Sequence, residues 1–129
     1  MEDIVVSLLL WLNLHGFPAC TEEPEIHRAS SNQANGYVAW YQDGVIDLSE
    51  RFDYEGLLLK PTSQRAKLAH STLLHELVHF CQAQREGSSH RYSEHAWLQR
   101  ENEAYAVQTS YLRAHGSSTV LAWRGNDGD

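Results

Sequence analysis

The sequence is poor in the features that mark several common classes of protein. Its 129 residues contain 10 Lys or Arg against 17 Asp or Glu, which gives a formal net charge of -7. Nucleic acids and anionic membranes attract basic residues and repel carboxylates, so this charge argues against both as partners. The only cysteines are Cys20 and Cys81, and without a CxxC pair a cysteine-ligated zinc site is not indicated. Cys81 lies in an apolar stretch, so we expect a buried free thiol there in preference to a structural disulfide.

Hydrophobic runs long enough to cross a bilayer are also lacking. The clearest run lies between Ile4 and Leu14, and acidic residues precede it where a signal peptide has Lys or Arg. Its helical spacing predicts a first helix that ends at Gly16 and packs on the core through Val5, Leu8, Leu9 and Leu12. We therefore expect a cytoplasmic protein, which would be secreted only if residues 1–20 acted as a signal peptide.

The length and composition of the chain fit one small folded domain. Hydrophobic residues make up 42% of the chain and Trp occurs four times, which is enough for one modest core. We assign residues 1–116 to a single domain. Residues 117–129 end in Gly-Asn-Asp-Gly-Asp and are assigned to a flexible tail.

A change of pattern between residues 22 and 55 predicts a small sheet. Residues 24–30 suit a short strand, and two runs of strand-forming residues, 37–41 and 45–49, flank an Asp43-Gly44 pair. An Asp-Gly pair between two such runs is typical of a hairpin turn. We expect two or three antiparallel strands before the long helices, which makes the fold class α+β. An edge strand of this sheet would either bind an extended peptide or only cover the core.

The most informative stretch is His75-Glu76-Leu77-Val78-His79. Four residues advance a helix by a little more than one turn, so His75 and His79 share a face and can hold one metal ion. Glu76 lies about 100° round the helix from His75 and can hold a water molecule on that ion. Two imidazoles and a carboxylate among apolar neighbours are costly to bury without a partner, and a metal supplies one.

The residues around this motif predict a long helix. The segment from Arg65 to Glu86 has apolar residues near helical spacing and contains no Gly or Pro. Thr62 or Ser63 can cap its start, and Gly87 can end it.

Two His make an incomplete zinc site, so a third ligand has to lie elsewhere. Arg85 stands where metzincins have a third His, which excludes that class. A Glu on a later helix is the other common solution, and a helix predicted over residues 96–115 and closed by Gly116 offers Glu101 and Glu103. Glu101 lies on the inward stripe of this helix, and Glu103 lies about 200° away. The helical face favours Glu101 and leaves Glu103 as the alternative. The other members of the stripe are Trp97, Leu98, Ala104, Tyr105, Gln108, Tyr111 and Leu112.

The segments around both sets of candidate ligands resemble a known group of enzymes. Residues 72–81 resemble the extended zincin signature, and Glu101-Asn-Glu-Ala104 resembles the Glu-x-x-Ala element of gluzincin metallopeptidases. Residues 63–115 are similar to small bacterial metallopeptidase families of unknown substrate, and the chain is similar to minigluzincins in size. Many gluzincins have an acidic residue four positions after the ligand Glu to orient a His, and Tyr105 stands there. The resemblance implies a zincin-like domain with one Zn²⁺ held by His75, His79 and Glu101.

The function that this resemblance implies is zinc-dependent hydrolysis, most simply of a peptide or protein substrate. Zinc would lower the pKa of a bound water, and Glu76 would take its proton during attack on the carbonyl and pass it to the leaving amine. Candidate donors to the oxyanion are Tyr105, Tyr111 and His115. The alternatives are a catalytically idle module that binds a peptide or partner protein, and an accidental motif that binds no zinc. Peptidases of the class that the chain resembles have a further helical domain that forms the far wall of the substrate cleft. The residues after His115 are too few to form such a domain, so we expect either a shallow cleft or a wall that a second copy or another molecule supplies.

Overall fold

The structure is a computed structural model that describes residues 1–17, 20–30, 36–86, 93–119 and 121. An N-terminal helix is followed by three strands, a short helix and two long helices, so the predicted α+β fold class is confirmed. In chain order the elements are α1 (Glu2–Leu14), β1 (Glu25–Ala29), β2 (Ala39–Gln42), β3 (Val45–Ser49), α2 (Tyr54–Leu58), α3 (Gln64–Glu86) and α4 (Glu94–Ala114).

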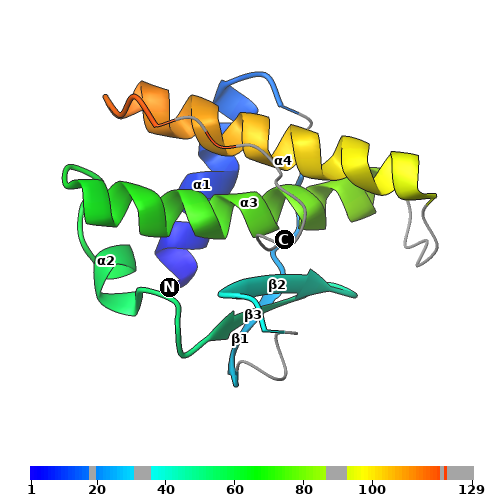
Figure 1. The fold of residues 1–129 in the computed structure, drawn as a ribbon, viewed down its shortest axis with the longest axis horizontal. Coiled ribbons are helices and arrows are strands. Elements are labelled where there is room, and N and C mark those ends of the chain that lie inside the picture. The colour runs from blue at the N-terminus through cyan, green and yellow to red at the C-terminus, as the bar shows by residue number, and fades with distance from the viewer. Residues whose placement is uncertain (18–19, 31–35, 87–92, 120, 122–129) are drawn as a thin grey trace.

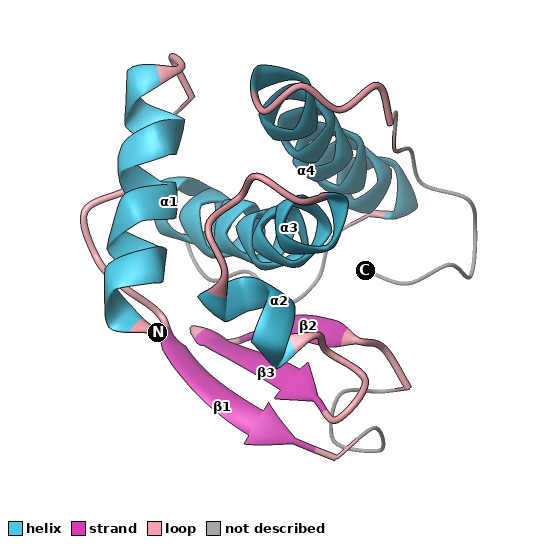
Figure 2. Ribbon diagram, turned by 90° about the vertical axis from the view of Figure 1, so that its left-hand side faces the viewer, coloured by secondary structure: helices cyan, strands magenta, loops and turns pink. Residues whose placement is uncertain are grey.

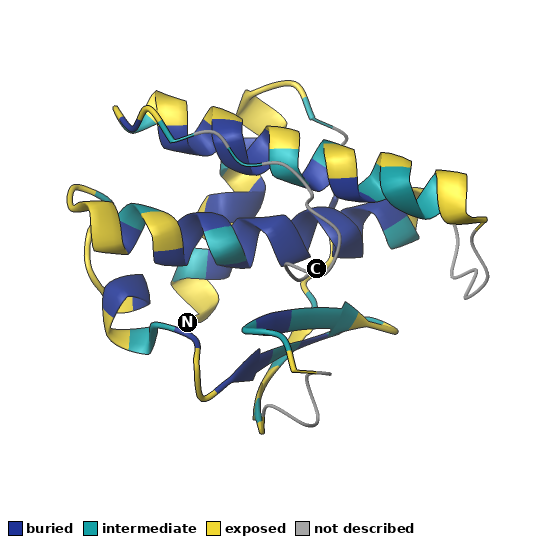
Figure 3. Cartoon of the chain, in the orientation of Figure 1, coloured by how far each residue is buried: buried dark blue, intermediate teal, exposed yellow. Residues whose placement is uncertain are grey.

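Helix α3 is the centre of the molecule. It contacts α1, α2, α4 and the strands β2 and β3, with α4 on one side and the sheet on the other (Figures 1 and 2). Every residue from Ser71 to Gln82 except Thr72 is buried, and Figure 3 shows this middle part of α3 in the buried colour. The HExxH motif therefore lies on a helix that is enclosed on all sides, which is the setting in which two imidazoles and a carboxylate need partners.

The sheet is mixed, so the prediction that all of its strands are antiparallel is wrong in one pairing. Strands β2 and β3 form the expected antiparallel hairpin, with Asp43 at φ 53° and Gly44 at φ 84° in its turn. Strand β1 pairs with β3 in parallel, in the order β1-β3-β2. Strands β1 and β2 run in opposite directions, and β3 lies between them, so β3 must run parallel to one of them. The alternation of apolar and polar residues along a strand shows which face of the strand is buried, but it does not show which neighbouring strand it pairs with.

Helix α1 packs on the core through the residues that its spacing indicated. Val5, Leu8, Leu9 and Leu12 are all buried, and the helix ends with Gly16 at φ 80°. Positive φ is easily adopted by Gly, and here it lets the Phe17 N–H donate to the carbonyl of Leu12 at 3.1 Å. Among the described residues, no helix is both long and apolar enough to cross a membrane.

The two long helices begin at serine caps. Ser63 Oγ accepts from the Ala66 N–H at 3.2 Å at the start of α3, so of the two predicted caps Ser63 makes the bond. Ser93 accepts from the Ala96 N–H at 3.1 Å at the start of α4. Gly116 has φ 83° at the end of α4, as expected, whereas Gly87, the predicted end of α3, lies outside the described residues.

Part of the predicted tail lies on the helices. Thr109 Oγ1 in α4 accepts from the Leu121 N–H at 2.9 Å, and Gln64 in α3 donates to Thr119 Oγ1 at 3.4 Å. Ser117 is buried. The remaining residues of the predicted tail, 120 and 122–129, lie outside the described residues.

Cys20 and Cys81 form a disulfide, so the prediction of a free thiol at Cys81 is wrong. The bond joins the segment after α1 to α3 across 61 residues, with a Cα–Cα distance of 5.3 Å, and both cysteines are buried. The apolar surroundings of Cys81 were read correctly, but its partner is far away in the sequence, and only the packing of α1 against α3 brings it near.

We expect loss of this disulfide to lower the stability of the fold. Closing a loop of this length reduces the entropy of the unfolded chain, and native disulfides typically contribute about 2–4 kcal/mol. Thermal unfolding followed by circular dichroism with and without reductant measures the effect. The matched control is the double variant Cys20→Ala and Cys81→Ala, which should unfold at one temperature under both conditions. An unchanged unfolding temperature of the reduced wild-type chain would contradict the expectation.

Candidate metal centre

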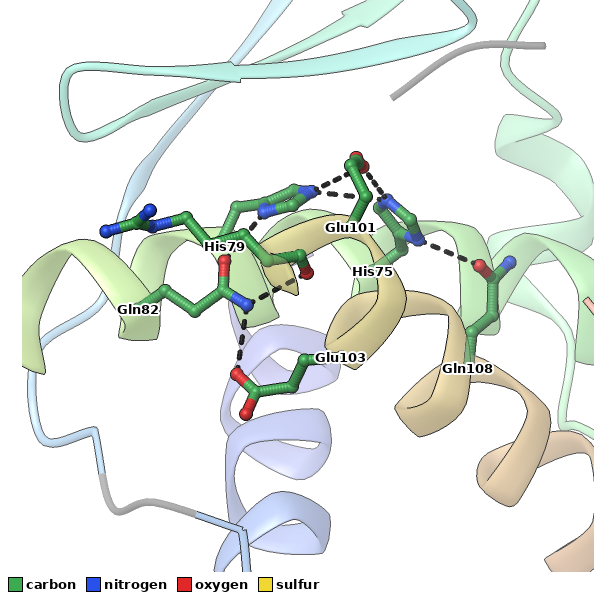
Figure 4. A network of polar contacts seen from close by, with 7 residues as sticks. His75, His79, Gln82, Glu101, Glu103 and Gln108 are labelled. Atoms are coloured by element: carbon green, nitrogen blue, oxygen red, sulfur yellow. Dashed lines mark hydrogen bonds and ion pairs between the residues drawn. The ribbon is translucent and has the colours of Figure 1, made fainter. Parts of the chain in front are cut away.

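Three donor atoms from two helices converge at the centre of the molecule. His75 and His79 come from α3 and Glu101 from α4, and all three side chains are buried (Figure 4). The Oε1 atom of Glu101 lies 3.2 Å from His75 Nε2 and 3.1 Å from His79 Nε2, and the two Nε2 atoms are 3.3 Å apart. The donors thus form a nearly equilateral triangle.

The size of this triangle matches one face of a zinc coordination tetrahedron. Zinc bonds of about 2.0–2.1 Å at tetrahedral angles put neighbouring ligand atoms about 3.3–3.4 Å apart. The three edges, at 3.1–3.3 Å, are within a few tenths of an ångström of that value. Three protein ligands leave the fourth corner for water or substrate, as in catalytic zinc sites.

The amide of Gln82 fixes the proton of His79. Gln82 Nε2 donates to the carbonyl oxygen of Arg100 at 3.0 Å and to Glu103 Oε1 at 2.9 Å, and neither group can donate in return. The amide oxygen therefore faces His79, 2.8 Å from Nδ1, and Nδ1 has to be the donor. The lone pair of a neutral His79 is then on Nε2, which faces Glu101.

The amide of Gln108, on α4, fixes the proton of His75 in the same way. Ser71 Oγ donates to the carbonyl oxygen of Leu68 at 3.0 Å and so accepts from Gln108 Nε2 at 3.3 Å. The amide oxygen of Gln108 then accepts from His75 Nδ1 at 3.0 Å. Both imidazoles thus present Nε2 lone pairs towards the carboxylate of Glu101.

These three electron-rich donors need a positive charge between them. Lone pairs on two nitrogens and an oxygen repel one another at 3.1–3.3 Å, and either a metal cation or a proton on one imidazole relieves the repulsion. A second carboxylate, Glu76, is fully buried on the same stretch of α3. If both carboxylates are ionised, a divalent cation balances both charges, whereas one proton balances only one.

Glu103, the alternative third ligand, lies outside the triangle. Its side chain is 36% exposed, and it accepts from Gln82 Nε2 and pairs with Arg85 at 3.2 Å. Glu101 is 0% exposed, so the inward orientation that the helical stripe predicted for it is confirmed. The role of Glu101 as a ligand stays a prediction.

Residues 1–125 match a family model described as a domain of unknown function, DUF6647. The chain belongs to this family. The match extends from α1 through the whole of α4 and therefore includes all of the residues of the triangle. Neither a curated protein nor a solved structure matches the chain.

The three candidate oxyanion donors of this DUF6647 chain lie in different places. Tyr105 is half-buried against His75, with their rings in edge-to-face contact at 4.5 Å. Tyr111 is buried between Trp11 and His115, and burial raises the pKa of Tyr111 to about 12. His115 Nδ1 lies 2.8 Å from the carbonyl oxygen of Tyr111 at the end of α4. Of the three, Tyr105 is the one that the structure places against a candidate ligand.

The contacts of Gln82 and Gln108 with the two histidines of this DUF6647 domain were not predicted from the sequence. Gln108 was placed on the inward stripe of the last helix without a function, and Gln82 was given none. Gln82 lies three residues after His79, about one helical turn, and Gln108 lies seven residues after Glu101, about two turns. This spacing is the only signal in the sequence that could have pointed to them.

Proposed function

We propose that this protein is a zinc-dependent hydrolase of gluzincin type that acts on peptides. The observation that carries the proposal is the triangle of His75, His79 and Glu101, with the buried Glu76 next to His75 in the chain. Two imidazoles, a carboxylate and an open fourth position are the donor set of a class of catalytic zinc sites. HExxH on a helix adds the carboxylate that such hydrolases use as their base.

Each residue has a distinct task in the proposed reaction. Zinc, when bound, would act as a Lewis acid and make a water molecule acidic enough to lose a proton near neutral pH. Glu76 takes that proton as the water oxygen attacks the peptide carbonyl carbon. Glu76 then gives the proton to the amide nitrogen as the C–N bond breaks, which yields a carboxylic acid and an amine. Tyr105, whose ring lies against His75, is the candidate donor to the oxygen that becomes negative.

The edge strand β2 supports a peptide as the substrate. In the order β1-β3-β2, no strand among the described residues pairs with one edge of β2, and β2 contacts α3. Tyr41 of β2 packs edge-to-face on Phe80, the residue after His79, at a ring distance of 6.2 Å. An extended peptide bound along a sheet edge by its main chain would therefore lie near the helical turn that carries the ligands.

The catalytically idle binding module stays as a second candidate, because the centre is deeply buried. His75 is 2% exposed, His79 is 9% exposed and Glu101 is not exposed at all. A substrate carbonyl has to reach the fourth position of an enclosed site, whereas a module that only binds a partner needs no such access. Both candidates share the zinc, so hydrolysis is the property that separates them.

Metal analysis of the purified protein is the first test. Elemental analysis after purification without added metal, and again after zinc loading and dialysis, should find about one zinc per chain. The donor set is also the one that non-haem Fe(II) enzymes use, so iron and manganese are measured in the same samples. Absence of zinc from both samples, or iron in its place, would overturn the proposal. Zinc together with cleavage of a broad peptide library would support it.

The cytoplasmic location stays a prediction, and the disulfide argues against it. Disulfides such as Cys20–Cys81 persist mainly in oxidising compartments and are rare in the cytosol. We therefore propose that the folded domain works in an oxidising compartment. Titration of free thiols in protein isolated from its native cells under non-reducing, alkylating conditions tests this, with no free thiol expected.

A further inference from the structure

We propose that Gln82 and Gln108 are positioning residues that set both histidines to present Nε2 to one cation. The two amides do the same task from opposite helices, since Gln82 belongs to α3 and Gln108 to α4. This inference rests on the proposed metal site, but the state of each imidazole can be measured without metal.

The hydrogen bonds around each amide favour one orientation of it. Gln82 Nε2 faces two acceptors, the Arg100 carbonyl and the Glu103 carboxylate, so the amide cannot turn round without placing oxygen against oxygen. Ser71 uses its proton on the Leu68 carbonyl, which leaves a lone pair for the Gln108 amide nitrogen. Each histidine therefore meets an amide oxygen at Nδ1.

The orientation of each amide selects a tautomer of the imidazole that it contacts. Neutral imidazole carries one proton, and Glu101 Oε1 competes for it at Nε2, so the amide oxygen at Nδ1 is the group that favours the tautomer with its proton on Nδ1. In solution neutral imidazole exchanges between two tautomers, with the proton on Nδ1 or on Nε2. Without the amides, part of the protein population would therefore carry a proton on Nε2 and could not bind a cation there. Groups that orient ligating histidines typically contribute 10–100-fold in metal affinity.

Both orienting groups are neutral, whereas many gluzincins have an acidic residue four positions after the ligand Glu. The position four residues after Glu101 holds Tyr105, whose ring contacts His75 without replacing that carboxylate. Gln108, seven residues after Glu101, occupies the Nδ1 side of His75 instead. Neutral amides orient the rings without adding negative charge, so the charge of a bound cation is balanced by Glu101 and Glu76 alone among the buried carboxylates described.

The variants Gln82→Met and Gln108→Met test the inference, because Met is also unbranched and has no strong donor or acceptor. Long-range ¹H–¹⁵N correlation spectra of the metal-free protein identify which ring nitrogen of each His carries a proton. We expect both histidines of the wild-type chain to carry the proton on Nδ1. Gln82→Met should change the tautomer of His79 alone, and Gln108→Met that of His75 alone. Zinc affinity, measured by competition with a chelator, should fall by about 10–100-fold in each.

Two further variants separate positioning from a general loss of structure. Gln84→Met changes an exposed glutamine on the same helix, and it should leave both tautomers and the zinc affinity unchanged. Gln108→Glu keeps an acceptor oxygen for His75 Nδ1, and Ser71 Oγ can turn its proton towards the second oxygen, so the tautomer of His75 should be restored. Unchanged tautomers in both Met variants, or a loss of affinity no larger than in Gln84→Met, would overturn the inference. A wild-type chain that binds no zinc would instead overturn the proposed function, and the tautomers would still decide the positions of the protons.

Discussion

Replacing Glu76 by Gln is expected to slow hydrolysis strongly while zinc stays bound. The amide has nearly the shape of the carboxylate but cannot accept a proton from water, and it removes one buried negative charge from the centre. General-base catalysis typically contributes about 10²–10⁴-fold, so kcat should fall by a factor in that range. Peptide cleavage followed by mass spectrometry gives the rate, and elemental analysis of the same sample gives the zinc content.

The matched control for this variant is Glu86→Gln on the same helix. Glu86 is ten residues from Glu76, its side chain is 37% exposed, and it pairs with Arg85 and Arg100 away from the triangle, so this variant should keep the wild-type rate. Equal rates in Glu76→Gln and in the wild-type chain would exclude Glu76 as the base. A wild-type chain that holds zinc and cleaves nothing in the peptide library would favour the idle binding module.

The sequence predicted the helical part of the site well because helical geometry is local. The spacing of His75 and His79 places them on one face of any helix that contains them, and the inward position of Glu101 follows from the same 3.6-residue period. Both long helices and the burial of Glu101 are confirmed. Such features depend on residues within a few turns of one another, which the sequence displays directly.

The features that the sequence did not predict depend on contacts between distant segments. The disulfide joins Cys20 to Cys81 through the packing of α1 on α3, and the parallel pairing of β1 with β3 depends on where the chain crosses the sheet. Gln108 contacts His75 across 33 residues of sequence. Glutamines are mostly exposed in folded proteins, so the burial of Gln108 beside an imidazole becomes visible only when α3 and α4 are packed together.

The assignment of Glu101 and not Glu103 as the third ligand predicts the second large effect, which is a loss of zinc affinity. We expect Glu101→Gln to lower zinc affinity by more than about 100-fold, because removing a ligand should cost more than removing a group that only orients one. Glu103→Gln is the matched control on the same helix. It keeps an oxygen that can accept from Gln82 Nε2, so its zinc affinity should remain within about 10-fold of the wild-type value. Competition with a chelator measures both affinities.

Unfolding of the metal-free proteins then separates a ligand from an ion-pair partner. If Glu101 serves only to pair with a protonated imidazole, Glu101→Gln should destabilise the metal-free fold, and zinc should stabilise neither the wild-type chain nor the variant. If Glu101 is a ligand, zinc should raise the unfolding temperature of the wild-type chain and of Glu103→Gln but not that of Glu101→Gln, since a ligand that binds only the folded state stabilises it in proportion to its affinity. Retention of zinc by Glu101→Gln together with its loss from Glu103→Gln would assign the third ligand to Glu103. That assignment would require α4 to turn by about half a revolution, because the two residues lie about 200° apart on the helix.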